Sequence, residues 1–148
     1  MKALIQRVTQ AKVDIDGATV GQIGPGVLVL LGITPTDTAA TAKKLAQRVA
    51  GYRMFADADD KMNLSLSDGQ GEALVVSQFT LAADTNSGRR PSFSSAAAPA
   101  VAEPLYEAFV HALTELGIGV ATGSFGADMQ VSLTNDGPVT FLLDTEKN

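Results

Sequence analysis

The sequence predicts a single α/β domain in which a β-rich sheet core is flanked by two helices. Its 148 residues fit one domain and are enough to bury a sizeable core. Short apolar or alternating runs, separated by glycine and proline, predict many strands. Two longer segments, near residues 37–50 and 100–116, carry apolar residues at helical spacing.

The first third of the chain predicts four strands. Lys2–Val8, Lys12–Asp16 and Thr19–Ile23 are short, and Asp16-Gly17 is a hairpin-type turn between the last two. Val27–Ile33 is apolar at nearly every position, which is typical of a central strand buried on both faces.

The first helix follows this central strand. Thr36 or Asp37 can cap its N-terminus, and the helical pattern reaches Ala50. Leu45 and Val49 are four residues apart and mark the face that packs on the sheet.

Between the helices we expect two strands and a long loop. Tyr52–Phe55 is a short strand, and Glu72–Phe79 is a buried one. Ala82–Pro99 is the loop, and loops of this length in compact domains are often functional. Within it, Arg89-Arg90 is the best local candidate for a phosphate contact.

The second helix covers Ala100–Leu116 and contains a proline. Pro104 fits only if the helix starts near Val101, so we expect a late or kinked start. The remaining pattern predicts a frayed end at residues 145–148, after three last strands: Gly119–Phe125, Met129–Thr134 and Val139–Leu143.

Composition narrows the function classes. The chain has no cysteine, which excludes disulfides and thiolate metal sites. It has no apolar run approaching the ~20 residues of a membrane span, and its start turns polar too soon for a signal peptide. We therefore expect a cytoplasmic protein with no membrane contact.

Charge gives a mixed indication about nucleic acid. The net charge of −5 argues mildly against such a partner, yet residues 1–90 hold ten of the eleven Lys and Arg. Six of these residues could form a basic face or could simply be solvated: Lys43, Lys44, Arg48, Arg53, Arg89 and Arg90.

The stretch Leu74–Leu81 is where we expect the chemistry. It begins as a buried strand and then presents Ser77, Gln78 and Thr80, interleaved with Phe79. A buried polar group left unpaired costs roughly 1–3 kcal/mol, so these side chains must be bonded, exposed or used. The structural alternative is a strand that leaves the core with hydroxyls capping the next loop.

A second stretch, Asn135-Asp136-Gly137-Pro138-Val139-Thr140, consists largely of turn formers. Together, this motif and Ser77-Gln78-Phe79-Thr80-Leu81 closely resemble the D-aminoacyl-tRNA deacylase family of homodimeric hydrolases that edit mischarged tRNA. The resemblance runs over nearly the whole chain and includes Ala3–Val8, Val27–Gly32, Gly51–Arg53, Lys61–Leu64, Arg90–Ser94 and Ala127–Leu133.

The residues themselves offer no conventional acid, base or metal site. His111 is the only histidine, sits mid-helix and has no ligand cluster around it. Two mechanisms remain open from the residues alone. Either Thr80 or Ser77 attacks the ester, or backbone N–H groups near Phe79 and Thr80 polarise it while the tRNA's 2′-hydroxyl or a water completes the reaction. The family resemblance favours the second route and implies no cofactor and no metal.

The resemblance also implies how the site is completed. The Gly137-Pro138 peptide would be cis and would enter the partner subunit's pocket for chiral selection. Arg7 would brace that motif across the dimer. Phe125 and Met129 match residues around the terminal adenosine.

We therefore predict that residues 1–148 form one D-aminoacyl-tRNA deacylase domain with a β-rich, partly barrel-like sheet core flanked by two helices. It would hydrolyse D-aminoacyl-tRNA, and mischarged glycyl-tRNA, to free amino acid and tRNA. The alternatives are a non-catalytic dimeric RNA- or nucleotide-binding module and a Ser/Thr esterase acting on another substrate.

Overall fold

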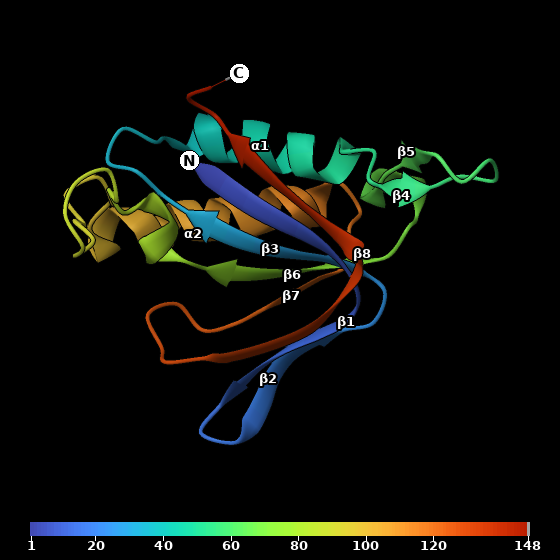
Figure 1. Ribbon diagram of the computed structural model, residues 1–148, viewed down its shortest axis with the longest axis horizontal. Coiled ribbons are helices and arrows are strands. Elements are labelled where there is room, and N and C mark those ends of the chain that lie inside the picture. Colours follow the sequence, from blue (N-terminus) through green and yellow to red (C-terminus); the bar gives the residue numbers. More distant parts are fainter. Residues whose placement is uncertain (148) are drawn as a thin grey trace.

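The computed structural model describes residues 1–147, and Figure 1 shows two long helices lying together on one side of a curled sheet. The helices are α1 (Ala39–Gly51) and α2 (Pro99–Glu115), with short 3₁₀ helices η1 (Leu66–Asp68) and η2 (Phe79–Ala82). The strands are β1 (Lys2–Ile15), β2 (Ala18–Ile23), β3 (Gly26–Gly32), β4 (Phe55–Ala56), β5 (Met62–Leu64), β6 (Glu72–Ser77), β7 (Val120–Thr122) and β8 (Gln130–Asp144).

The main sheet has the order β2-β1-β3-β6-β7, and β8 also pairs with β1. The pairs β3–β6 and β6–β7 are parallel, whereas β1 is antiparallel to its three partners. The sheet curls until β2 approaches β7, where a Cβ built on Gly21 would lie 2.2 Å from the carbonyl oxygen of Thr122. Only glycine permits this close approach, and the prediction of a single domain with a partly barrel-like sheet is confirmed.

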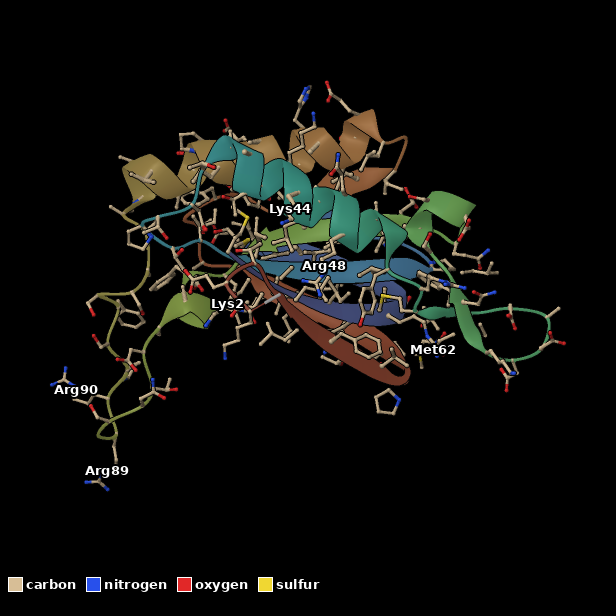
Figure 2. The ribbon with its side chains drawn as sticks, turned by 90° about the horizontal axis from the view of Figure 1, so that it is seen from above. Lys2, Lys44, Arg48, Met62, Arg89 and Arg90 are labelled. Carbon is tan, nitrogen blue, oxygen red and sulfur yellow. The ribbon has the colours of Figure 1, made fainter. Side chains whose placement is uncertain are left out.

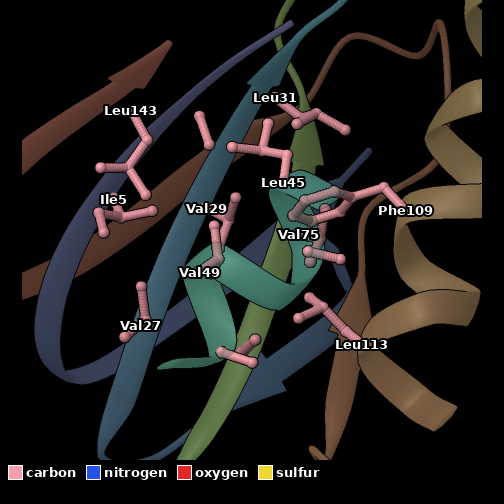
Figure 3. Packing of buried hydrophobic residues seen from close by; sticks show 14 of the residues in the cluster. Ile5, Val27, Val29, Leu31, Leu45, Val49, Val75, Phe109, Leu113 and Leu143 are labelled. Atoms are coloured by element: carbon pink, nitrogen blue, oxygen red, sulfur yellow. The ribbon is translucent and has the colours of Figure 1, made fainter. Parts of the chain in front are cut away.

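Apolar residues fill both faces of the central strands. On one face, Val29 and Val75 pack against Leu45 of α1 and Phe109 of α2 (Figure 3). On the other face, a smaller cluster fills the curl of the sheet and consists of Val8, Ala11, Val13, Ile23, Leu28, Leu74 and Val76. Alternate residues of β3 and β6 therefore enter different cores, which explains their unbroken apolar sequences.

Helix α1 begins later than predicted. Its N-cap is Thr38, not Thr36 or Asp37, and the Thr38 hydroxyl accepts a hydrogen bond from the amide of Thr41. Asp37 is instead occupied by the start of the chain, since its carboxylate accepts hydrogen bonds from the Met1 ammonium group at 2.9 Å and the Thr34 amide at 2.7 Å.

The two ends of the described chain are joined to each other. The Met1 ammonium group also donates to the hydroxyl of Thr145, and the amide of Thr145 donates to the carbonyl of Met1 at 3.0 Å. The Met1 side chain is completely buried. The prediction of a frayed end is therefore wrong at Thr145, and residue 148 lies outside the described residues.

Helix α2 starts early rather than late. It begins at Pro99, where a proline loses no intrahelical bond, and the amides of Val101 and Ala102 both donate to the carbonyl of Ala98. Pro104 consequently lies inside the helix, on its exposed side. Burial of Ala102 and Tyr106 in the first two turns offsets the bond that Pro104 cannot donate.

Several strand boundaries also differ from the predictions. The two strands expected within residues 2–16 are one continuous strand, β1. Register shifts at Gln6–Gln10 and Val13–Asp14 allow it to pair with β2 and β8 along its length. The strand expected at Tyr52–Phe55 begins only at Phe55, and β7 is shorter than Gly119–Phe125. No helix within residues 1–147 is long and apolar enough to cross a membrane.

Candidate active site

A cavity of about 770 Å³ opens where the parallel strands β3 and β6 end. Its walls come from the ends of these two strands, from η2, from the start of α2 and from residues 125–131. The lining contains no charged side chain and is mainly apolar, with Ser77, Gln78 and Ser94 as its polar side chains. Ligand sites in sheets of this kind lie at the carboxyl ends of parallel strands.

Strand β6 delivers the first sequence motif to this cavity. The strand ends at Ser77 and not at Phe79 as predicted, because the chain turns into η2 at Phe79. The amide of Gln78 makes the last hydrogen bond to β3, to the carbonyl of Leu31 at 2.8 Å. Ser77, Gln78 and Phe79 line the cavity. Thr80 stands just outside the lining, is exposed, and accepts a hydrogen bond from the side-chain amide of Gln78.

The turn into η2 leaves two backbone donors free. Among residues 1–147, the hydrogen bonds around η2 use the amides of Gln78, Leu81 and Ala83 but not those of Phe79 and Thr80. The first N–H groups of any helix lack an intrahelical acceptor. These two amides are therefore free to donate to a ligand oxygen.

Among residues 1–147, neither the Thr80 nor the Ser77 hydroxyl is hydrogen-bonded to a His, Asp or Glu side chain that could act as a general base. His111 is exposed on α2, pairs with Glu115 at 2.9 Å, and lies nine residues beyond Ala102, which is ~14 Å along the helix from the cavity wall. In the part of the chain that the structure describes, no three His, Cys, Asp or Glu side chains are grouped to hold a metal. The site therefore offers hydrogen-bond donors and shape, without an acid–base pair.

Aromatic residues flank the cavity in two pairs. Phe79 and Phe93 form its exposed rim with ring centroids 5.2 Å apart. Phe125 lines the wall beside Met129, and its ring lies 5.9 Å from that of Tyr106. Sequence reasoning placed Phe125 and Met129 here and missed Phe93, which lies in the Arg90–Ser94 segment. Flat aromatic faces of this kind suit a nucleobase.

Tyr106 lies behind the wall and was also missed. Its hydroxyl donates to the carbonyl of Val75 at 2.9 Å, two residues before Ser77 on β6. Burial raises the pKa of Tyr106 to about 12, although a hydrogen bond to Thr122 opposes the rise. Tyr106 is therefore protonated at neutral pH and ties α2 to the strand that ends in the cavity.

The second sequence motif forms a bulge in β8. Val8 pairs with Asn135 and Gln6 with Thr140, so that Arg7 alone faces residues 136–139. The Asn135 side chain closes the base of this bulge, accepting from the amide of Val139 at 2.7 Å. The prediction of a turn between two separate strands is corrected: β8 is one strand interrupted by a bulge, because β1 supplies partners on both sides of it.

Gly137 and Pro138 lie at the tip of this bulge, are exposed, and share a cis peptide bond, as the resemblance implied. Gly137 has φ = +145°, and a Cβ added to it would lie 2.6 Å from the Val139 side chain. The conformation and the space both demand glycine.

Arg7 braces the bulge from within its own chain. Its Nε donates to the carbonyl of Asp136 at 2.9 Å, and its Nη1 donates to the carbonyl of Met54 at 2.9 Å. The Asp136 carboxylate lies 3.6 Å from the same Nε. These contacts are intrachain, because β1 and β8 are direct neighbours. Bracing across a dimer, which the resemblance implied, stays a prediction.

The bulge and the cavity of one chain lie apart. Val131 of β8 lines the cavity, and Gly137 is six residues further along this strand, which corresponds to at most about 20 Å because the strand is bulged. Neither Gly137 nor Pro138 lines the cavity. The fold thus groups Ser77, Gln78, Phe79, Phe125 and Met129 in one place, and Arg7 with Gly137-Pro138 in another.

Residues 4–144 match the family described as D-Tyr-tRNA(Tyr) deacylase. The chain belongs to this family. Two relatives named D-aminoacyl-tRNA deacylase, from Haemophilus influenzae and Idiomarina loihiensis, are 60% and 61% identical, and each alignment covers 97% of this chain and 99% of the relative.

Solved structures agree with the deacylase family fold. A structure of the c-Myc DNA Unwinding Element Binding Protein is 39% identical with a TM-score of 0.92 and covers 98% of this chain and 99% of that one. A protein described as "a probable eukaryotic D-amino acid tRNA deacylase" is 18% identical, covers 96% and 97% of the two chains, and shares the fold with a TM-score of 0.82.

Proposed function

We propose that this protein hydrolyses the ester bond of D-aminoacyl-tRNA and releases free D-amino acid and tRNA. One observation carries the proposal: a mainly apolar, uncharged cavity lies beside the start of η2, where two backbone amides make no hydrogen bond among residues 1–147, in a chain whose relatives are named D-aminoacyl-tRNA deacylase. The terminal adenosine would enter against Phe125 and Met129. We place the protein in the cytoplasm, where aminoacyl-tRNA is made.

The chemistry follows from what the cavity contains. The amides of Phe79 and Thr80 donate to the ester carbonyl oxygen, which becomes negative as water attacks the carbonyl carbon. The bond from that carbon to the ribose 3′-oxygen then breaks. The proton lost by water passes to the 3′-oxygen through the neighbouring 2′-hydroxyl of the tRNA. No side-chain base is required, because an aminoacyl ester is already activated and is held in position.

Chiral selection is assigned to the bulge of a second subunit. Gly137-Pro138 is exposed and does not line the cavity of its own chain, which supports a role at the cavity of another copy. In a homodimer with two-fold symmetry, each bulge would enter the partner's cavity. Its backbone carbonyls would exclude an L side chain at Cα, while a D side chain would point to solvent.

This mechanism predicts a simple pattern of substrates. Different D side chains should be cleaved at similar rates because none is gripped, and glycyl-tRNA should be cleaved because it has nothing to exclude. A side-by-side assay with D-Tyr-, D-Asp-, Gly- and L-Tyr-tRNA tests it. Rapid cleavage of the L ester, or full resistance of the glycyl ester, would overturn exclusion by backbone.

A second candidate is a nucleic-acid-binding module without catalysis, a class to which the name of one structural neighbour, c-Myc DNA Unwinding Element Binding Protein, belongs. The deacylation assay separates the two candidates directly. A Ser/Thr esterase is disfavoured, because the Thr80 hydroxyl has the Gln78 amide rather than a base as its side-chain partner.

A further inference from the structure

An exposed arm projects from the rim of the cavity. We define the arm as residues Asp84–Ser92, all of which are exposed. Its base is closed by two main-chain hydrogen bonds between Asp84 and Ser92, of 2.7 and 2.9 Å. The Asp84 carboxylate also accepts from the amide of Asn86 at 2.9 Å, which orders the outgoing strand of the arm. The arm is thus a closed hairpin rather than a loose connection.

The ends of the arm are built into the cavity. It follows directly on η2, which carries Phe79, and it leads directly into Phe93. These two rings contact each other at the rim, with centroids 5.2 Å apart. The hydroxyl of Ser95 further anchors the returning chain by donating to the carbonyl of Ala82 at 2.5 Å. The arm therefore begins and ends next to residues of the cavity rim.

Two arginines stand at the far end of the arm. Figure 2 shows Arg89 and Arg90 well away from the body of the protein, with both guanidinium groups pointing outward. Arg89 lies three residue steps from Ser92 at the base, so its backbone stands at most about 11 Å from the base of the arm. Within residues 1–147, neither arginine lies within ion-pair distance of a carboxylate. Both guanidinium groups are free to bind an anion.

The cavity lining carries no positive charge, and these arginines could supply it. No charged side chain lines it, so it can hold a nucleoside but cannot neutralise the phosphates that follow. The chain as a whole carries a net charge of −5 and would repel a polyanion. A guanidinium group binds phosphate bidentately, and two in succession suit two successive phosphates.

We propose that Arg89 and Arg90 bind the phosphate backbone of the tRNA acceptor stem while its 3′ end lies in the cavity. This inference rests on the proposed function and adds to it a docking surface for the body of the substrate. The arm would determine affinity for tRNA without touching the reacting ester.

The test compares two variants with the same change of charge. Arg89→Gln/Arg90→Gln removes the arginines of the arm, and Lys43→Gln/Lys44→Gln removes two exposed charges from α1, on another surface of the molecule (Figure 2). Deacylation of D-Tyr-tRNA is measured over a range of salt concentrations, alongside D-tyrosyl-adenosine, an ester with no phosphate. Binding of uncharged tRNA is measured by fluorescence anisotropy over the same range.

We expect the arginine variant to raise KM for D-Tyr-tRNA, to leave kcat unchanged, and to reduce the salt slope of tRNA binding by about 2, one for each lost contact. Cleavage of D-tyrosyl-adenosine should not change, and the lysine variant should match the wild type. An unchanged salt slope in the arginine variant, or an equal loss in the lysine variant, would overturn the proposal. If the wild type cleaves neither ester, the proposed function fails, and the anisotropy measurement still decides the role of the arm.

Discussion

The cavity at the end of β6 and the bulge in β8 are held in place in different ways. The cavity is lined by four separate stretches of the chain, and the buried Tyr106 packs against Phe125 of its wall. The bulge is exposed and is fixed by the side chains of Arg7 and Asn135. A cavity supported by the core can bind a ligand within one chain. A projection that is fixed rigidly, yet far from its own cavity, is suited to act on another chain.

The largest expected effect comes from Gly137→Ala. The added Cβ would meet Val139 and the Arg7 guanidinium, and φ = +145° is unfavourable for alanine, so the tip of the bulge must move. Displacing a positioning element by about 1 Å can cost ~100-fold in activity. We expect a loss of that order in D-Tyr-tRNA deacylation with only a small change in Tm, measured by differential scanning calorimetry.

Mixing two defective variants tests whether the cavity and the bulge act in different chains. Ala98→Trp would fill the cavity from an exposed lining position and leave the bulge intact. After the Gly137→Ala and Ala98→Trp proteins are unfolded and refolded together, half of the dimers should be mixed. Each mixed dimer has one site with both an intact cavity and an intact bulge, so we expect about a quarter of wild-type activity. Absence of recovery, with both proteins dimeric by light scattering, would place the complete site within one chain.

A smaller but still clear effect is expected for Arg7→Gln. It removes charged hydrogen bonds to the carbonyls of Asp136 and Met54, each contributing about 1.5–3 kcal/mol when well formed. Partial exposure of the side chain reduces the total, and we expect a loss of about 2 kcal/mol in urea unfolding. Activity should fall together with stability, in contrast to Gly137→Ala. A stable but inactive Arg7→Gln protein would show that the guanidinium acts on substrate instead.

Tyr106→Phe tests whether the hydrogen bond from Tyr106 to β6 stabilises the protein, through the pH dependence of the free energy of unfolding. The pKa of Tyr106 rises from 10.0 to about 12, so its stabilisation is fully present below pH 10 and is lost as pH rises through 12. We expect the variant to be about 1 kcal/mol less stable at pH 7, through loss of the hydrogen bond to Val75. The difference should shrink between pH 10 and 12. A difference that stays constant over that range would show that the hydroxyl does not titrate as assigned.

The smallest effect is expected for Thr80→Ala. The Thr80 hydroxyl lies outside the cavity lining and contacts only the Gln78 side chain among the described residues 1–147, whereas its backbone amide is retained in the variant. We expect less than a tenfold loss in kcat. An acyl-enzyme ester trapped on Thr80, or a variant that binds substrate but cannot cleave it, would contradict catalysis by backbone amides.

Sequence patterns predicted the parts of the fold that depend on nearby residues. The apolar run of residues 73–76 marked β6, and the helical spacing of Leu45 and Val49 marked α1. The resemblance placed Phe125, Met129 and the residues from Ser77 to Thr80 in the site; all of them line the cavity except Thr80, which stands just outside it. Local periodicity is sufficient for the strand and the helix, whereas the site residues came from the family resemblance.

Features that depend on distant partners could not be predicted in this way. The continuity of β1 and β8 is determined by their pairing with each other, across more than a hundred residues of sequence. The same pairing brings Arg7 to Asp136, and tertiary packing alone places the hydroxyl of Tyr106 on Val75. The N-cap of α1 is Thr38 and not Asp37, because the Asp37 carboxylate binds the Met1 ammonium group, 36 residues away from Asp37 in sequence.

The contact between Met1 and Thr145 brings the two ends of the described chain together. Because these residues share hydrogen bonds, the described chain is nearly a ring, and a short linker could close it. New ends could then be opened in the exposed arm near Gly88, which would yield a circular permutant with the same sheet order. Closing the chain would destabilise it at one point. A peptide bond at Met1 would replace the ammonium group, and the buried Asp37 carboxylate would lose its ion-pair partner. Asp37→Asn would be the natural companion change, because it removes the carboxylate that the linker leaves without its partner.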